Sequence, residues 1–116
     1  MPQITLQELT VEGCPAVSVS GELNINTAPD LREILIKHLK KNEDVILLNL
    51  SELEFMDTSG LATLIEAHLK AERYGGKVGL FGLQSRITEV LAVTNVTKLF
   101  HIFSSAEEAV KVLKGA

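Results

Sequence analysis

Short apolar runs alternate along this chain with segments in which apolar residues recur three or four positions apart. The run at 44–50 is almost continuously apolar, which is typical of a strand covered on both faces. The segment 28–41 carries Leu31, Ile34, Leu35 and Leu39 along one side of a helix, as an amphipathic helix does. Strands that alternate with helices form mostly parallel sheets joined by right-handed crossovers. The alternation therefore predicts an α/β fold.

The same patterns predict where the elements lie. Strands are expected at 4–11, 16–20, 44–50, 77–81 and 99–103, and helices at about 28–41, from 58 to the glycine pair at 75–76, from 85, and after a Ser105/Glu108 capping box. The first two strands flank a turn at 12–15 and are expected to form an antiparallel hairpin, with Gly21 ending the second strand. We expect one domain over residues 1–116, with its core at about 4–113.

Composition narrows the classes of partner and compartment. The chain has 116 residues, and 11 Lys and Arg against 15 Asp and Glu give a net charge of −4. An acidic balance without a basic block argues against nucleic acid as a partner, and no apolar run approaches the ~20 residues that a bilayer requires. Cys14 is the single cysteine, so an internal disulfide and a cysteine zinc cage are excluded. No signal peptide is visible, and we expect a cytoplasmic monomer or weak dimer.

The segment 50–61 is the most informative part of the sequence. It runs from the end of a predicted strand into a predicted helix, where open α/β sheets place their sites. The unpaired N–H groups of the first helical turn can be capped by Asp57, Thr58 or Ser59. The same helix end also favours a phosphate, including one attached to a hydroxyl. From the residues alone, a simple helix cap and a modified hydroxyl both remain open.

The sequence favours no enzymatic or metal site. A nucleophilic serine needs a neighbouring base, and His68 lies nine residues beyond Ser59, roughly 13 Å along one helix. His38 and His101 lie outside any hydrolase motif. The three histidines are far apart in sequence and lack the i, i+4 pairing or cysteine partners of a metal site. We therefore expect no enzyme, no metal and no cofactor.

The motif FMDTSGL at 55–61 closely resembles the phosphorylation-site motif of bacterial anti-sigma factor antagonists, the STAS domain family. The family pattern is an apolar pair followed by Asp-Ser-Ser/Thr-Gly-Leu at the start of the second helix. A second segment, GEL at 21–23 followed by Thr27-Ala28, is similar to the family's G-E-L-D-x-x-x-A segment. The predicted order of elements also matches the family over roughly residues 4–113. The resemblance implies a STAS-type domain with a mostly parallel central sheet, an N-terminal antiparallel hairpin and about four helices.

The resemblance also implies functional residues. Ser59 would be the phosphate acceptor, with Thr58 as the second candidate, and Asp57 would position the acceptor or the metal of the kinase. The partner-binding residues would be Asp57, Thr58, Ser59, Gly60, Leu61 and Asn24. Asn24 is a departure, because the family often has Asp at this position, and we expect either altered contact with the kinase or an unusual partner.

The implied mechanism is partner switching in bacterial transcription regulation. The unphosphorylated domain would bind an anti-sigma factor serine kinase and release the sigma factor, and phosphorylation of Ser59 would switch this binding off. The alternative is a STAS scaffold or accessory subunit of a transporter or signalling complex, in which Ser59 is only a helix cap. Phosphopeptide mass spectrometry distinguishes the two.

Overall fold

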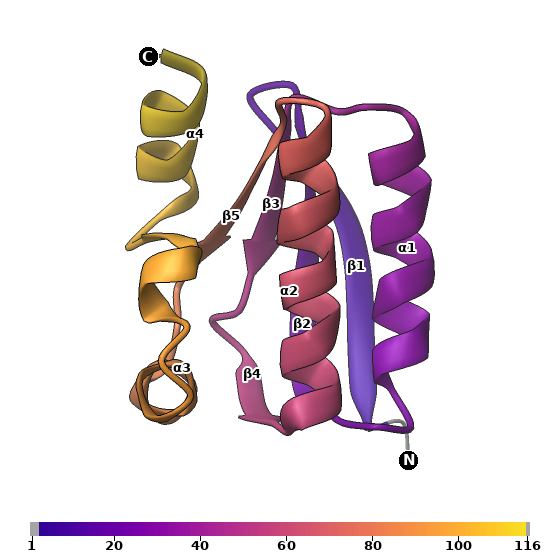
Figure 1. Cartoon of the computed structure of the whole chain (residues 1–116), viewed down its shortest axis with the longest axis vertical. Helices are drawn as coiled ribbons and strands as arrows, with labels where there is room; N and C mark the ends of the chain where they lie inside the picture. Colours follow the sequence, from indigo (N-terminus) through magenta and orange to yellow (C-terminus); the bar gives the residue numbers. More distant parts are fainter. Residues whose placement is uncertain (1–2, 116) are drawn as a thin grey trace.

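One β-sheet organises the chain, as the computed structural model of residues 3–115 shows (Figure 1). Over these residues, six strands and four α-helices confirm the predicted α/β fold. The elements are, in order, β1 (Ile4–Val11), β2 (Cys14–Leu23), α1 (Ala28–Lys40), β3 (Val45–Asn49), β4 (Leu53–Met56), α2 (Thr58–Arg73), β5 (Lys77–Phe81), α3 (Ser85–Val93), the 3-10 turn η1 (Thr97–Leu99), β6 (His101–Phe103) and α4 (Ala106–Gly115).

The strands lie in the order β1-β2-β3-β5-β6, and neighbours from β2 onward are parallel. β1 and β2 form the predicted antiparallel hairpin. Glu12 and Gly13 connect them with φ values of 50° and 83°, as a two-residue turn that matches strand twist requires. The turn is shorter than predicted, because Cys14 and Pro15 already belong to β2 and pair with Val11 and Thr10 of β1.

β4 was not predicted, and it brings part of the segment 50–61 into the sheet. The chain leaves the sheet after β3 and rejoins it as β4, which pairs with the last residues of β2. The prediction that Gly21 ends β2 is wrong: Gly21 takes a φ of 100° beside a register shift, and the strand continues to Leu23. This bulge lets β2 pair first with β3 and then with β4.

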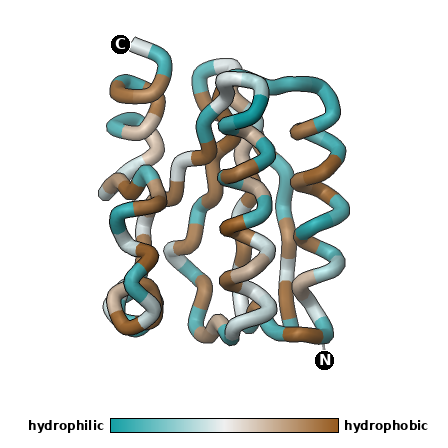
Figure 2. Tube along the Cα trace, in the orientation of Figure 1, coloured by the Kyte–Doolittle hydropathy of each residue, from teal (hydrophilic) through white to brown (hydrophobic). Residues whose placement is uncertain are grey.

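Helices cover both faces of the sheet. α1 and α2 lie side by side on one face, while α4 covers the other (Figure 1). β3 shows how the sequence serves both layers: Ile46 and Leu48 join the core beneath α1 and α2, and Val45 and Leu47 join the core beneath α4. Figure 2 shows hydrophobic residues alternating with hydrophilic ones along α1 and α2. Within residues 3–115, no helix combines the length and apolar character needed to cross a membrane.

The starts of α4 and α1 differ in their side-chain caps. The Ser105 hydroxyl accepts a hydrogen bond from the Glu108 N–H at 3.1 Å, which confirms the Ser105 cap. The Glu108 carboxylate reaches back to the Ser104 N–H at 2.8 Å, one residue before the cap, and not to Ser105 as the predicted capping box requires. Thr27 does not cap α1 through its side chain in the described part of the chain. Its hydroxyl instead donates to the Glu22 carbonyl at 2.8 Å, which closes the loop between β2 and α1.

Candidate functional site

The first turn of α2 is capped by Asp57. The Oδ1 atom of Asp57 accepts hydrogen bonds from the N–H groups of Ser59 at 2.9 Å and Gly60 at 3.1 Å. The capping role that the sequence left open among three residues therefore belongs to Asp57. Because Asp57 supplies the cap, the Ser59 hydroxyl lies at the positive end of the helix dipole without that duty.

Asp57 also ties α2 to the loop that precedes α1. Its Oδ2 atom accepts from the Ile25 N–H at 3.2 Å, and its own N–H donates to the Leu23 carbonyl at 3.1 Å. Asn24 shapes the same loop, because its Oδ1 atom accepts from the N–H groups of Asn26 at 2.9 Å and Thr27 at 3.2 Å. The two motif segments, about 35 residues apart in sequence, thus meet at one end of the sheet.

The remaining motif residues divide into surface and core. Thr58 is exposed and Ser59 is half-buried, whereas Gly60 and Leu61 are buried. A Cβ atom on Gly60 would lie 2.7 Å from the Leu23 Cγ atom and 2.9 Å from the Leu23 carbonyl oxygen. Gly60 therefore packs α2 against Leu23 of β2, and Leu61 joins the buried core. Their direct contact with a partner stays a prediction.

Two exposed apolar side chains lie beside this helix end. Ile25 is 70% exposed and Phe55 is 48% exposed. The sequence prediction did not include Ile25, although its position next to Asn24 in the GEL-containing segment was an available signal. Exposed apolar groups at such a helix end are suited to burial in a protein contact.

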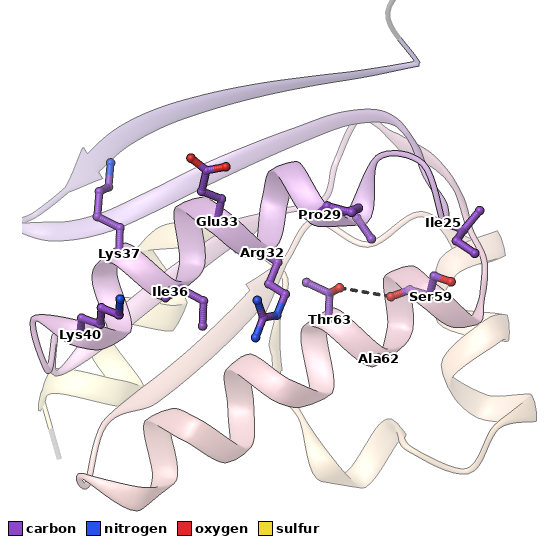
Figure 3. Close-up of a pocket in the computed structure, with 11 residues that line it drawn as sticks. Ile25, Pro29, Arg32, Glu33, Ile36, Lys37, Lys40, Ser59, Ala62 and Thr63 are labelled. Atoms are coloured by element: carbon purple, nitrogen blue, oxygen red, sulfur yellow. Dashed lines mark hydrogen bonds between the residues drawn. The ribbon is translucent and has the colours of Figure 1, made fainter.

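Ser59 also lines a groove of about 940 Å³ between α1 and α2. Figure 3 shows Pro29, Arg32 and Ile36 on the α1 side. Ser59 and Thr63 lie on the α2 side, where the Thr63 hydroxyl donates to the Ser59 carbonyl at 3.2 Å (Figure 3).

An ion pair crosses between the two helices. Arg32 donates to both carboxylate oxygens of Glu66, at 2.6 and 2.8 Å, and Lys70 lies 2.9 Å from the same carboxylate. Arg32 first, and then Lys70, lower the pKa of Glu66 to about 2. The positive charge of Arg32 in the groove is therefore already neutralised by a neighbour.

A second polar cluster lies farther along α2. His68 and Glu72 are one helical turn apart, with 3.8 Å between His68 Nε2 and Glu72 Oε1. The ring of His101, from β6, lies 5.8 Å from that of His68 between centroids. His68 and His101 are distant in sequence but close in the fold. Burial, with contributions from Lys77 and His68, lowers the pKa of His101.

Residues 6–109 match the family model described as the STAS domain. The chain belongs to the STAS domain family. Its relatives include an anti-sigma-B factor antagonist of Staphylococcus epidermidis, which is 27% identical over 105 residues that cover 90% of this chain and 96% of the relative. The predicted family resemblance is thereby confirmed.

Solved structures share the STAS fold of this chain. The crystal structure of an anti-sigma factor antagonist from Mycobacterium paratuberculosis has a TM-score of 0.86 at 24% identity and covers 96% of this chain and 94% of that one. The phosphorylated form of the Bacillus cell fate determinant SpoIIAA has a TM-score of 0.71 at 18% identity, covering 95% and 98%. At these identities the likeness confirms the fold.

Proposed function

We propose that this STAS domain is an anti-sigma factor antagonist that binds an anti-sigma factor serine kinase and is switched by phosphorylation of Ser59. The observation that carries the proposal is that Asp57, and not Ser59, caps the start of α2. Asp57 holds the N–H groups of Ser59 and Gly60, and the Ser59 hydroxyl is left for modification at a helix end that accommodates phosphate. The names of the relatives as anti-sigma factor antagonists support the same role.

The surface around Ser59 supports a protein contact. The exposed side chains of Ile25 and Phe55 flank the helix end, and hydrogen bonding through Asp57 fixes the Ile25 loop beside it. A preformed apolar surface loses little conformational freedom when a partner covers it. The kinase would therefore bind the unmodified domain through this surface and release its sigma factor.

Phosphorylation would weaken that contact through charge. A phosphate on Ser59 adds roughly −1.5 to −2 charge, next to the Asp57 carboxylate and to apolar Ile25 and Phe55. In a desolvated contact this charge meets like charge and apolar surface, and a 100-fold loss of affinity needs only about 2.8 kcal/mol. The helix end itself tolerates the phosphate, so the fold stays intact.

The direct test uses the cognate anti-sigma factor serine kinase that the proposal requires. In calorimetric titrations we expect Ser59→Asp to lose roughly 100-fold or more in affinity, and Ser59→Ala to bind as the wild type does. Thr10→Asp is the control, since it places the same charge on an exposed residue at the other end of the β1–β2 hairpin, and it should bind as the wild type does. With labelled ATP, Thr58→Ala should still accept phosphate and Ser59→Ala should not.

Three outcomes would contradict the proposal. Normal kinase binding by Ser59→Asp would exclude a charge switch at this position. Unchanged phosphate incorporation by Ser59→Ala would move the acceptor to Thr58. A wild-type chain that neither binds the kinase nor carries phosphate in cells would favour the non-switching scaffold.

A further inference from the structure

We propose that His68, Glu72 and His101 form a binding site for a divalent transition-metal ion, with Zn²⁺ as the ion that fits best. One donor atom from each of the three side chains lies within 4.8 Å of the other two. The site lies on the C-terminal half of α2, away from Ser59, and is independent of the proposed phosphorylation switch.

The fold presents the three groups from two elements. His68 and Glu72 are four residues apart on α2, so their side chains project from the same face of the helix. His101 is the first residue of β6 and brings its ring beside that of His68. A metal ion at this point would therefore link the helix layer to the edge strand of the sheet.

Burial fixes one of the ligands in place. His68 is only 5% exposed, and its ring packs edge-on against Phe100 with 6.0 Å between centroids. Among residues 3–115, the buried atoms His68 Nδ1 and His101 Nε2 have no hydrogen-bond partner. Buried polar atoms without partners are rare and cost free energy. A metal ion between the rings would give one of these nitrogens a partner.

Glu72 divides its two oxygens between neighbours. Oε1 lies 3.8 Å from His68 Nε2, while Oε2 lies 3.7 Å from the Lys77 ammonium group. Oε1 thus lies towards His68, and Oε2 can keep its contact with the Lys77 ammonium group when a metal ion binds Oε1. Because Glu72 is an exposed residue, its side chain can move towards an arriving ion without disturbing the core.

The donor set selects the class of metal. Two imidazole nitrogens and one carboxylate oxygen are the protein ligands of one group of zinc sites, which keep a fourth position open. Mg²⁺ and Ca²⁺ prefer oxygen ligands throughout. In tetrahedral zinc, donors are about 3.4 Å apart, so the three groups must draw together by about 1 Å. Rotation of Glu72 and His101 side chains, which are not fully buried, can supply this movement.

The test is a calorimetric titration of the full, untagged chain with zinc chloride. We expect one zinc ion per chain, no binding of Mg²⁺, and a cobalt complex with the absorption of a tetrahedral site. Glu72→Gln and His101→Gln should each lower zinc affinity by roughly 10-fold or more, since even the outer partners of metal ligands are worth that much. Both positions are less buried than His68, so these variants should fold, and circular dichroism checks this.

Two controls match the variants. His38→Gln removes another buried histidine beside a carboxylate, since His38 Nε2 lies 2.9 Å from Glu8 Oε1. Glu89→Gln removes an exposed glutamate on α3. Both controls should bind zinc as the wild type does. The proposal is overturned if the wild type shows no saturable zinc binding, if both site variants keep its affinity, or if His38→Gln loses as much. None of these outcomes depends on kinase binding.

Discussion

Gly60 is the residue on which the position of α2 depends most directly. Its Cα faces Leu23 at the end of β2, and the space for a side chain is already filled by Leu23 atoms. The same contact sets where the Ser59 hydroxyl lies relative to the loop at 24–27. A glycine in a helix normally lowers stability relative to alanine, so the close approach is the physical reason for glycine here.

Replacing Gly60 by alanine should destabilise the protein by about 1–3 kcal/mol, as overpacking of a filled core does. Helix propensity alone would give the opposite sign, a gain of about 1 kcal/mol. Urea unfolding followed by circular dichroism measures the difference. Gly115→Ala is the matched control, because a Cβ atom at that helical glycine meets nothing within 4 Å. A stabilised Gly60→Ala protein would contradict the packing argument.

Asp57 combines a cap with a charge, and two substitutions separate them. Asp57→Ala removes the acceptor for the N–H groups of Ser59, Gly60 and Ile25, so it should lower the free energy of unfolding by about 1–2 kcal/mol. Asp57→Asn keeps a good N-cap oxygen and should lose less than about half of that. Thermal and urea unfolding check both values. Equal losses in the two variants would show that the charge, not the cap, stabilises this turn.

At the scale of elements, α1 and α2 are joined by the Arg32–Glu66 pair across their groove. The pKa of Glu66 is lowered from 4.5 to about 2, so ionised Glu66 favours the folded state. This contribution is fully present above pH 4.5 and is lost as the pH falls towards 2. The Arg32–Glu66 pair, which joins α1 and α2 across the groove beside Ser59, therefore weakens in acid.

Glu66→Gln should lower stability modestly at pH 7, and the difference from the wild type should shrink as the pH falls from 4.5 to 2. Urea unfolding at several pH values measures this narrowing. The control is Glu107→Gln, which changes an exposed glutamate on α4. Its difference in unfolding free energy from the wild type should not depend on the Arg32–Glu66 pair. A Glu66→Gln deficit that stays constant down to pH 2 would contradict the assignment.

Most elements could be predicted because their residues repeat with a clear period, and the exceptions have physical reasons. β4 is only four residues long, with Leu53 and Met56 buried and the two residues between them exposed, which is too short to show a strand period. On α2, Leu69 lies four residues after Ile65, yet it is 48% exposed, while its neighbour His68 is buried. The apolar stripe of α2 continues through Ala67 and Ala71, and helical geometry places residue 68 on this side.

At the scale of the whole molecule, α2 connects two chemically different sites. The motif at its N-terminus could be predicted, because FMDTSGL is continuous in sequence and lies where a strand gives way to a helix. The cluster of His68, Glu72 and His101 could not, because His101 arrives from β6, 33 residues after His68. β6 pairs with β5, and β5 packs against α2, and this arrangement brings the two rings together.

The distance between these sites makes them electrostatically independent. Residues 68 and 72 lie about 13–20 Å from Ser59 along the helix, at a rise of 1.5 Å per residue. The Debye length at 0.15 M salt is about 8 Å, so a phosphate and a zinc ion interact by only a few tenths of a kcal/mol.

We therefore predict that Ser59→Asp changes the zinc affinity by less than about twofold, and that Glu72→Gln leaves kinase binding unchanged. Calorimetric titration of each variant with zinc and with the kinase completes the double test. A change of about tenfold or more in either cross-experiment would require a conformational link through α2, because screened charges over this distance cannot supply the 1.4 kcal/mol it represents. Hydrogen exchange along α2 would then locate the segment that responds.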